Sequence, residues 1–449
     1  MPRKHNPNLP RGYGHSQSYS RPSTQPIYAR SSDRIDPRPL SRRILAWIPK
    51  LILAGVVLVA FSLYPESRLE TSRDFGEVWG IQKHHLSNSI SEEIIANEFP
   101  SIVTINSDQS NFDAIVHYNI KPDLNSFIDD TIARYGPDYA AVVVLQPHTG
   151  RILAMSSFVK DNSLNHNLAV HSGFPAASLF KIVTAAAAID TGVARPGSIY
   201  QYNGKNSSLY KSNVLRHKTN KWTRNTSLSK AFALSINTVF GRIGVYDVGA
   251  ETLQTYADVF GFNRPVPVDF SIESSKTGFH SGDEWSIAEA ASGYTLDTTI
   301  SPVHAAMLAS VIANDGVLVE PSLIDFAVDT SGPLLYKSEP DSARVFDKKT
   351  SDELRVLMRA TVKKGSAKKH FRTFFRGPYV NLDVGGKTGS LTGHNPKGKT
   401  EWFVGYGDSG KDKVAIAAVV VNKEKWYIKP ARLARFVLEE YFKHEATQG

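Results

Sequence analysis

The order of strand-like and helix-like segments most constrains the fold of this chain. Two apolar runs within 139–157 flank a Pro/Gly turn, which predicts a β-hairpin. Three further strand-like segments lie much later, at 384–391, 401–406 and 414–421. The chain between the two groups has helical patterns. Strands at both ends of a long helical middle predict an α+β fold, in which helices cover an antiparallel sheet and the middle forms a helical lobe.

The predicted helices share apolar residues at helical spacing and are bounded by Pro, Gly or polar residues. They span 176–190, 228–246, 251–260, 285–292, 302–314, 351–364 and 430–444. Residues 65–134 are less regular, with a short helical candidate at 91–97 and an alternating segment near 115–120. We expect this part to form a stalk and a small leading segment.

An apolar run near the N-terminus predicts a membrane span. Residues 44–64 contain one charge, Lys50, and a helix of 21 such residues is long enough to cross a bilayer. A buried core helix is the alternative, but such a helix rarely lacks a polar face. The positive-inside rule places residues 1–43 in the cytoplasm and the chain after the span outside. A cleaved signal peptide fits less well, because the segment before the run is long for a leader.

The basic charge is concentrated in the N-terminal tail. Residues 1–50 hold ten Lys and Arg against two acidic residues, and the net charge of the whole chain is +9. Because the tail is rich in Pro, Ser, Gln and Asn, we expect it to be disordered. The rest of the chain is close to neutral, so we expect no nucleic-acid partner. The absence of cysteine excludes disulfides, a thiolate nucleophile and Cys-based metal sites, and we expect no cofactor or metal.

A serine three residues before a lysine on a helix can form a nucleophile and base pair, because the side chains lie one turn apart on one face. The chain contains five such pairs: Ser157/Lys160, Ser178/Lys181, Ser208/Lys211, Ser227/Lys230 and Ser366/Lys369. Four have simpler explanations. Ser157 ends a strand and Ser208 lies in a polar segment typical of a solvated loop. Ser227 suits a helix N-cap, and Ser366 lies in a run of lysines typical of a solvated face.

Ser178 is the candidate nucleophile. It follows Pro175 at the start of a helix whose remainder, 182–189, is small and apolar. Burial there lowers the pKa of Lys181 toward a value at which the neutral amine can accept the Ser178 proton. The helix N-terminus also favours negative charge that develops on a nearby oxygen. A capped core helix without a catalytic role is the alternative.

A second candidate motif is Ser235-Ile-Asn237, which lies in an apolar segment, whereas its counterpart at 163–165 lies in a polar loop. If the backbone is extended at 235–237, the Ser235 and Asn237 side chains point to the same side. If it is helical, the serine hydroxyl bonds to its own turn instead.

A third motif, Lys387-Thr388-Gly389-Ser390, lies on a predicted strand, whereas the other Lys-Thr-Gly, at 276–278, lies in a Ser-rich loop without strand neighbours. On an edge strand, Gly389 would let a peptide approach and pair with the backbone. Lys387 and Thr388 could then hold a carboxylate. A phosphate-binding loop is excluded, because Asn381 stands where its first glycine would be and no helix follows.

The three motifs occur in the order Ser-x-x-Lys, Ser-x-Asn and Lys-Thr-Gly, separated by 57 and 152 residues. In this order and context they resemble the penicillin-binding protein and serine β-lactamase superfamily. Residues 140–155 resemble the first hairpin of that superfamily. Residues 293–307 and the Asn-Asp-Gly turn at 314–316 resemble a further segment. The resemblance implies a penicillin-binding transpeptidase-like catalytic domain over 135–449.

The resemblance also implies catalytic roles. Ser178 would attack the carbonyl of a D-Ala-D-Ala peptide and form an acyl-enzyme, with Lys181 as general base. Ser235 would relay the proton to the leaving amine, and Asn237 would bind the substrate amide. The oxyanion would lie between the backbone N–H groups of Ser178 and Ser390.

The same resemblance assigns substrate binding to the third motif. Lys387 and Thr388 would bind the terminal carboxylate, and Gly389 would lie beside the substrate backbone. Ser390 departs from the family pattern, because threonine is common at this place in transpeptidases, but it keeps a hydroxyl.

The leading interpretation is a D,D-transpeptidase that cross-links peptidoglycan stem peptides outside the bacterial inner membrane and is acylated by β-lactams. A D,D-carboxypeptidase and a β-lactamase of the same fold are alternatives. An alternative of another class is a non-catalytic β-lactam or muropeptide sensor. Only about 70 residues separate the span from the catalytic domain, so we expect a monofunctional member without a glycosyltransferase domain. Other cell-wall synthesis proteins are candidate partners.

Overall fold

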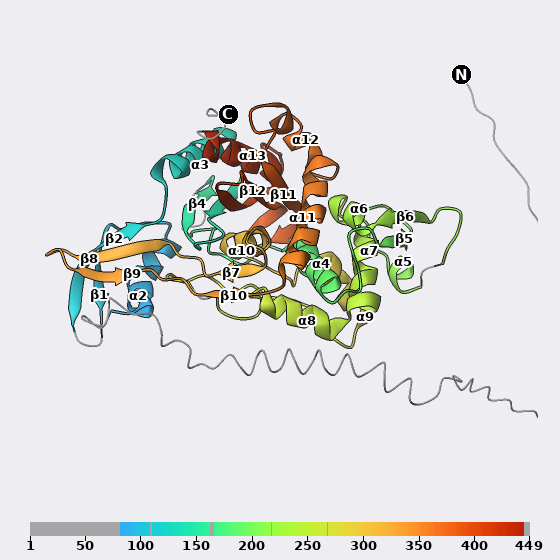
Figure 1. Cartoon of the computed structure of the whole chain (residues 1–449), viewed down its shortest axis with the longest axis horizontal. Coiled ribbons are helices and arrows are strands. Elements are labelled where there is room, and N and C mark those ends of the chain that lie inside the picture. Colours follow the sequence, from blue (N-terminus) through green and yellow to red (C-terminus); the bar gives the residue numbers. More distant parts are fainter. Residues whose placement is uncertain (1–80, 108–109, 162–165, 217, 267, 444–449) are drawn as a thin grey trace, which may run out of the picture. The chain divides into compact units, whose positions relative to one another are not determined.

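The computed structural model describes residues 81–443, apart from 108–109, 162–165, 217 and 267 (Figure 1). The predicted tail at 1–43 and the predicted span at 44–64 lie outside the described residues. Within the part of the chain that is described, no helix combines the length and the apolar character that crossing a bilayer requires.

A five-stranded antiparallel sheet forms the centre, in the order β11-β12-β13-β3-β4. β3 and β4 form the predicted hairpin, and β11, β12 and β13 follow one another near the C-terminal end. β13 pairs with β3, so two groups of strands that are far apart in the sequence complete one sheet. β11 is an edge strand. The bounds are β3 Tyr139–Leu145, β4 Ile152–Val159, β11 Asp383–His394, β12 Lys397–Asp408 and β13 Lys413–Asn422.

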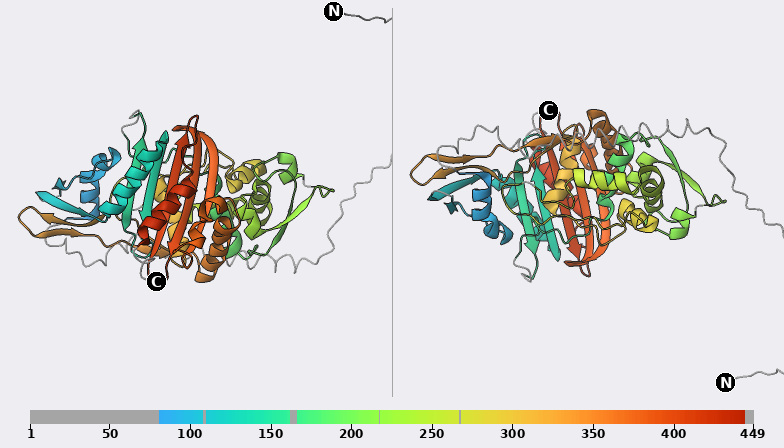
Figure 2. Two further views of the ribbon diagram at one scale, coloured as in Figure 1. Left: turned by 90° about the horizontal axis from the view of Figure 1, so that it is seen from above. Right: turned by 90° about the horizontal axis from the view of Figure 1, so that it is seen from below.

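Both faces of this sheet are buried. Successive side chains of each strand point to opposite sides, so each strand contributes to two cores. In β13, Ala417 and Val419 pack into one core, whereas Ile416 and Ala418 pack into another. α10 (Pro302–Ala313) covers the first face. α3 (Pro122–Tyr135) and α13 (Pro430–Tyr441) lie side by side over the second face (Figure 2). Burial on both faces explains why these strands are nearly continuous apolar runs.

The middle of the chain forms the predicted helical lobe beside the sheet, around the buried helix α4 (Figure 1). A small two-stranded sheet of β5 and β6, which the sequence did not indicate, belongs to the lobe. The elements are η3 Ala177–Leu179, α4 Lys181–Asp190, β5 Ile199–Tyr202, α5 Lys211–Leu215, β6 Arg224–Ser227, α6 Leu228–Ala233, α7 Asn237–Arg242, the π-helical turn η4 Ile243–Val248, α8 Ala250–Val259 and α9 Glu284–Ser292. The α+β class, the antiparallel sheet covered by helices and the lobe are therefore confirmed.

The single helix predicted over 228–246 is wrong, because the chain breaks between α6 and α7. Ser235 has a φ of 55°, in the left-handed region that a non-glycine residue adopts at a cost. The extended backbone considered for 235–237 is also absent, since Asn237 begins α7. A sharp turn between two short helices replaces both expectations.

A second antiparallel sheet has the order β1-β2-β8-β9. The expected leading segment supplies β1 and β2, and residues far along the chain supply β8 and β9. The helix expected at 91–97 begins earlier, as α2, and α3 was not expected. A separate pair, β7 with β10, completes this side. The bounds are α2 Lys83–Ile95, β1 Ile102–Asn106, β2 Asn111–Tyr118, β7 Val317–Val319, β8 Ile324–Asp329, β9 Leu334–Lys337 and β10 Ser342–Arg344.

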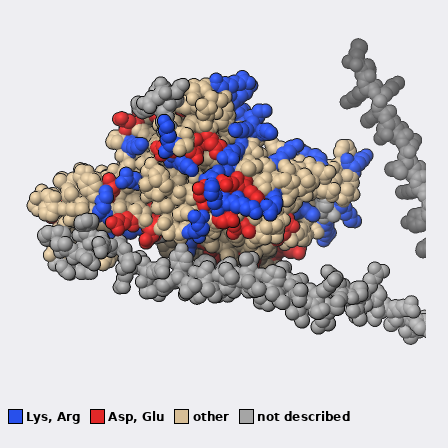
Figure 3. All heavy atoms as spheres, in the orientation of Figure 1, with Lys and Arg blue, Asp and Glu red and all other residues tan. Residues whose placement is uncertain are grey.

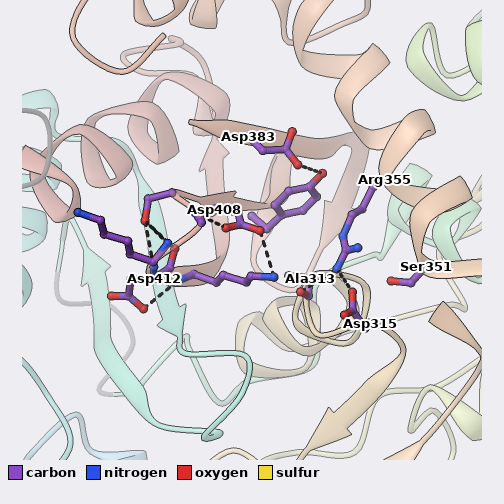
Figure 4. A network of polar contacts seen from close by, with 12 residues as sticks. Ala313, Asp315, Ser351, Arg355, Asp383, Asp408 and Asp412 are labelled. Carbon is purple, nitrogen blue, oxygen red and sulfur yellow. Dashed lines mark hydrogen bonds and ion pairs between the residues drawn. The ribbon is translucent and has the colours of Figure 1, made fainter. Parts of the chain in front are cut away.

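Helix α11 (Lys348–Lys363) packs against the edge strand β11, and two of its arginines form ion pairs with neighbouring elements. Arg355 of α11 lies 2.5 Å from the Asp315 carboxylate, and the right-hand side of Figure 4 shows this pair. Arg359 donates two hydrogen bonds, of 2.6 and 2.5 Å, to Asp383 at the start of β11. The Arg359–Asp383 contact holds the strand that carries the Lys-Thr-Gly motif. The short helices α12 (Lys368–Phe371) and η5 (Phe374–Arg376) follow α11.

Candidate active site

Ser178 lies in the short 3-10 turn η3, directly before α4, which begins at Lys181. The Oγ of Ser178 and the Nζ of Lys181 are 2.8 Å apart, within hydrogen-bond distance. Ala177, the preceding residue, has a φ of 48°, which is unusual for a residue with a side chain. Local strain of this kind is often found where the fold holds a reacting group in place. The structure thus brings the predicted nucleophile and base together.

The turn that carries Ser178 packs directly against the C-terminal end of α9. An added Cβ at Gly293 would lie only 1.8 Å from the carbonyl oxygen of Ala177, and Gly293 has a φ of 63°. Only glycine fits both requirements. The neighbouring Ser292 carbonyl accepts a hydrogen bond from the Lys181 amine. The end of α9 therefore fixes both the nucleophile turn and the amine.

Ser235 and Asn237 both reach the site from the turn between α6 and α7. The Asn237 side-chain oxygen accepts a 2.8 Å hydrogen bond from Lys181 Nζ. Its amide nitrogen donates to the carbonyl of Ser207 over 2.9 Å. Ser235 Oγ lies 3.0 Å from Lys387 Nζ. The left-handed turn at Ser235 thus directs its hydroxyl to one lysine, while Asn237 contacts the other.

The Lys-Thr-Gly motif lies on a strand, as predicted, and this strand, β11, is the edge of the central sheet. Lys387 is fully buried, whereas Ser390 is exposed. An added Cβ at Gly389 would lie 3.4 Å from the Ala177 Cβ, so the strand passes close to the nucleophile turn. The Thr388 hydroxyl lies 2.5 Å from the hydroxyl of Ser366. Strand and turn together form one wall and the floor of a cleft.

Burial changes the proton affinity of the two amines. It holds the pKa of Lys181 well below the usual lysine value, and the nearby Lys387 amine lowers this pKa further. Burial also lowers the pKa of Lys387 to about 7. The direction for Lys181 is the one expected from the sequence. A neutral amine beside Ser178 can accept its proton, whereas an ammonium group cannot.

A cavity of about 660 Å³ opens over these groups. Of the eight predicted site residues, six line it, and Lys181 and Lys387 contact the lining residues from behind. The six are Ser178, Ser235, Asn237, Thr388, Gly389 and Ser390. The sequence did not identify several further lining residues as part of the site, namely Lys205, Asn206, Ser207, Arg224, Tyr294, Lys369, His370, Glu401, Trp402 and Lys429.

Two segments interpreted as solvated belong to this cavity. Asn206 accepts a backbone hydrogen bond from Asn237, so the polar stretch near Ser208 supports the site. Ser366, which lies in a run of lysines, lines the cavity and donates its backbone N–H to the carbonyl of Ala233. Their partners are far away in the sequence, so no local pattern could have indicated these contacts.

The other copies of the motifs, which the sequence analysis set aside, agree in part with that interpretation. Ser227 caps α6 by accepting a 3.2 Å hydrogen bond from the backbone of Lys230. Lys276 of the second Lys-Thr-Gly lies outside the central sheet, although its backbone pairs with Thr299 in an isolated bridge. The second Ser-x-Asn, at 163–165, lies outside the described residues.

The mouth of the cavity is basic. Lys205, Arg224 and Lys369 line it, and Figure 3 shows Lys and Arg side chains gathered over α12 and over the lobe. Among the lining residues that the structure describes, Glu401 is the one carboxylate. Both its oxygens lie 2.7 Å from the Lys429 amine. Uncompensated positive charge at the mouth favours an anionic ligand.

A partly buried histidine that lines the cavity lies near the same positive charges. Burial is the main reason that the pKa of His370 falls to about 4, and nearby cations lower it further. Those cations are Lys369, Lys429, Arg432 and Arg435.

Most of the folded part of the chain matches a known protein family. The model of the family described as "Penicillin binding protein transpeptidase domain" matches residues 140–437. The chain is 26% identical over 317 residues to the peptidoglycan D,D-transpeptidase PbpA of Mycolicibacterium smegmatis, across 64% of this chain and 62% of that protein. It is 25% identical to the stage V sporulation protein D of Bacillus subtilis, across 59% of this chain and 41% of that protein. The chain thus spans less than two thirds of the length of these relatives.

Solved structures show the same architecture. The D,D-transpeptidase domain of a peptidoglycan glycosyltransferase from Eggerthella lenta is 25% identical, with a TM-score of 0.61, across 74% of this chain and 83% of that chain. The ceftriaxone acyl-enzyme complex of penicillin-binding protein A from Mycobacterium tuberculosis is 23% identical and has a TM-score of 0.61. It covers 73% of this chain and 80% of that one, and at this identity it shows the fold alone. With its cavity, its sheet and the match over most of its folded part, the chain belongs to the penicillin-binding protein transpeptidase family.

Proposed function

We propose that this chain is a D,D-transpeptidase that cross-links peptidoglycan stem peptides through an acyl-enzyme on Ser178, and that β-lactams acylate the same serine. The observation that carries the proposal is the 2.8 Å distance between Ser178 Oγ and the buried Lys181 Nζ, on the floor of a cavity bounded by an edge strand. The activities that the names of its relatives state agree with it.

In the first step, Ser178 Oγ attacks the carbonyl carbon of a D-Ala-D-Ala bond and its proton passes to the neutral Lys181 amine. The backbone N–H groups of Ser178 and Ser390 stabilise the oxyanion. The tetrahedral intermediate then collapses and the carbon–nitrogen bond breaks. The terminal D-Ala leaves after its nitrogen receives the proton, through Ser235.

In the second step, the amine of another stem peptide attacks the ester carbonyl. A new peptide bond forms as the ester bond between the acyl carbon and the Ser178 oxygen breaks, and that oxygen recovers, through Lys181, the proton that the attacking amine loses. Asn237 binds the amide of the donor peptide. The edge strand β11 pairs with the backbone of the donor, while Lys387 and Thr388 bind its terminal carboxylate before D-Ala leaves.

The contacts of Glu401 support a transpeptidase over a β-lactamase. A β-lactamase hydrolyses its acyl-enzyme quickly, which requires a base that activates water. The Glu401 carboxylate, the one that lines the cavity within the described chain, is bound to Lys429 through both oxygens. We therefore expect the β-lactam acyl-enzyme to be long-lived.

A turnover assay tests the function. Full-length protein in detergent is incubated with a D-Ala-D-Ala stem pentapeptide and a labelled amine acceptor, with Ser178→Ala as control. A transpeptidase releases D-Ala and joins the acceptor to the peptide. Release with water as the sole acceptor would indicate a carboxypeptidase. Penicillin labelling without D-Ala release would indicate a sensor instead.

We also propose a single-pass anchor in the bacterial inner membrane. The sequence supports a disordered basic tail at 1–43, a span at 44–64, a stalk and leading segment at 65–134, and a catalytic domain at 135–449 outside the membrane, near other cell-wall synthesis proteins. Protease added to spheroplasts should digest the catalytic domain and leave an N-terminal fragment protected. Protection of the catalytic domain in sealed cells would contradict this topology.

A further inference from the structure

Three side chains able to bind a metal meet at a place that the proposed reaction does not use. His166 and His171 lie between β4 and η3, and Glu273 lies between α8 and α9. One ligand atom from each lies within 4.8 Å of the other two. His171 Nδ1 and His166 Nε2 are 2.8 and 3.5 Å from the same oxygen of Glu273. Two loops far apart in the sequence therefore converge on one point.

The spacing of these atoms suits a small divalent cation. Zinc bonds of about 2.0–2.1 Å in a tetrahedral site place neighbouring ligand atoms about 3.3 Å apart. The two distances to the Glu273 oxygen lie on either side of that value. The rings of His166 and His171 are almost perpendicular, at 87°, so they do not stack on each other. Small side-chain movements would bring the three atoms to the ligand positions.

An ion pair between His171 and Glu273 explains only part of this arrangement. The Nε2 of His166 is enclosed, and its contact with the Glu273 oxygen, at 3.5 Å, is too long for a well-formed hydrogen bond. An enclosed polar atom with so weak a partner costs free energy, and a bound cation would supply a stronger one. The second nearby histidine, rather than the ion pair, is therefore the feature that points to a metal.

We propose that His166 Nε2, His171 Nδ1 and Glu273 Oε1 bind a divalent transition-metal ion, with Zn²⁺ as the best match. Two imidazoles and one carboxylate are a ligand set typical of zinc, and three protein ligands leave one position for water. Glu273 is 46% exposed, so water can reach the ion. The other Glu273 oxygen accepts a 3.0 Å hydrogen bond from the Ser172 backbone, which orients the carboxylate.

The metal would act as a positioning element, because contacts lead from it to the nucleophile turn. The His171 ring packs edge-on against Phe174, with centroids 5.7 Å apart, and Phe174 packs in the same way on Trp402. Trp402 lines the cavity and donates its indole N–H to the carbonyl of Pro175 over 3.0 Å. A cation that joins the two loops would restrict the chain that leads to Ser178. This inference does not depend on the proposed transpeptidase activity.

Metal binding to full-length protein in detergent tests the proposal. After chelator treatment, we expect equilibrium dialysis to give one tightly bound Zn²⁺ per chain. His166→Ala and His171→Ala should each weaken binding by about tenfold or more. His148→Ala, in the exposed turn between β3 and β4, is the matched control and should bind Zn²⁺ as the unaltered protein does. The proposal would be overturned if the wild-type protein did not bind stoichiometric Zn²⁺, or if the His166→Ala and His171→Ala variants bound Zn²⁺ as tightly as the wild type.

A second measurement guards against variants that fail to fold. Co²⁺ in place of Zn²⁺ should give the visible absorption of a tetrahedral site in the wild-type protein. Glu273→Gln keeps the size of the side chain and an acceptor for Ser172, and it should lose this spectrum while melting cooperatively without metal. A Glu273→Gln spectrum identical to that of the wild type would exclude Glu273 as a ligand.

Discussion

Lys387 of the edge strand donates a 3.0 Å hydrogen bond to Ser235 of the helical lobe, and this contact joins the two sides of the cavity. On the lobe side, Lys181 contacts both Ser178 and Asn237 at 2.8 Å. Each of the two buried amines thus holds a hydroxyl that the proposed reaction uses. Burial of the two amines, and not a neighbouring carboxylate, is the main influence on the pKa values of Lys181 and Lys387.

Replacing Lys181 tests the proposed base. Lys181→Met keeps the volume of a fully buried side chain but removes the amine, so acylation by a penicillin should slow by about 10²- to 10⁴-fold. Stopped-flow measurement with a chromogenic β-lactam gives the rate, and thermal melting checks that the fold persists. An acylation rate equal to that of the wild type would mean that another group accepts the Ser178 proton.

The pH profile tests the coupling between the two amines. Acylation should fail at low pH, where Lys181 is protonated, and the Lys387 charge lowers the pKa of Lys181. Lys387→Gln removes that charge and can still hydrogen-bond Ser235. Lys181 then keeps its proton to higher pH, so the acidic limb of the rate profile should move to higher pH. Lys369→Gln, an exposed lysine at the cavity mouth, is the control, and an unmoved limb in Lys387→Gln would contradict the coupling.

Sequence patterns predicted the parts of the fold that depend on local signals. The apolar runs at 139–157 and 414–421 are strands because both their faces are buried, and burial on both faces gives continuous apolar runs. Helices such as 302–314 have end signals within the segment itself. The grouping of the motif residues in one site could be predicted because the motifs occur in a recognisable order on predicted strands and helices.

The features that the sequence did not indicate depend on contacts between distant residues. The turn at Ser235 breaks an apparently continuous helix, because Lys387 and Lys181 bind the two side chains that the turn presents. Ser366 reaches the cavity through a backbone bond to Ala233. The strands β8 and β9 are short, and the pairing of β8 with β2 and of β9 with β8 comes from the fold as a whole.

Two cations that share one carboxylate should differ in their effect on stability. Arg355 is 8% exposed and Lys348 is 62% exposed, and both lie near Asp315. Arg355→Ala also leaves the Ala313 carbonyl without its buried donor, so it should cost about 2 kcal/mol of unfolding free energy. Lys348→Ala should cost no more than about 0.5 kcal/mol. Denaturant unfolding monitored by circular dichroism measures both, and equal losses would contradict the assigned role of the buried arginine.

The basic mouth of the cavity should matter most for anionic substrates. Combining Lys205→Gln with Lys369→Gln should lower kcat/KM for a stem peptide that carries additional carboxylates by about three- to tenfold, and should weaken its dependence on salt. Lys411→Gln, in the exposed turn between β12 and β13, is the control. If the double variant keeps the kcat/KM and the salt dependence of the wild type, the mouth does not attract the substrate.

The most direct test of the central claim is to locate the covalent adduct after reaction with a penicillin. Peptide mapping by mass spectrometry should find the adduct on Ser178, and Ser178→Ala should carry none. Ser227→Ala, which removes only a helix cap, and Ser366→Ala, which removes a hydroxyl at the cavity wall, should both keep the adduct on Ser178. An adduct on any other residue of the wild-type protein, or labelling that persists in Ser178→Ala, would contradict the account.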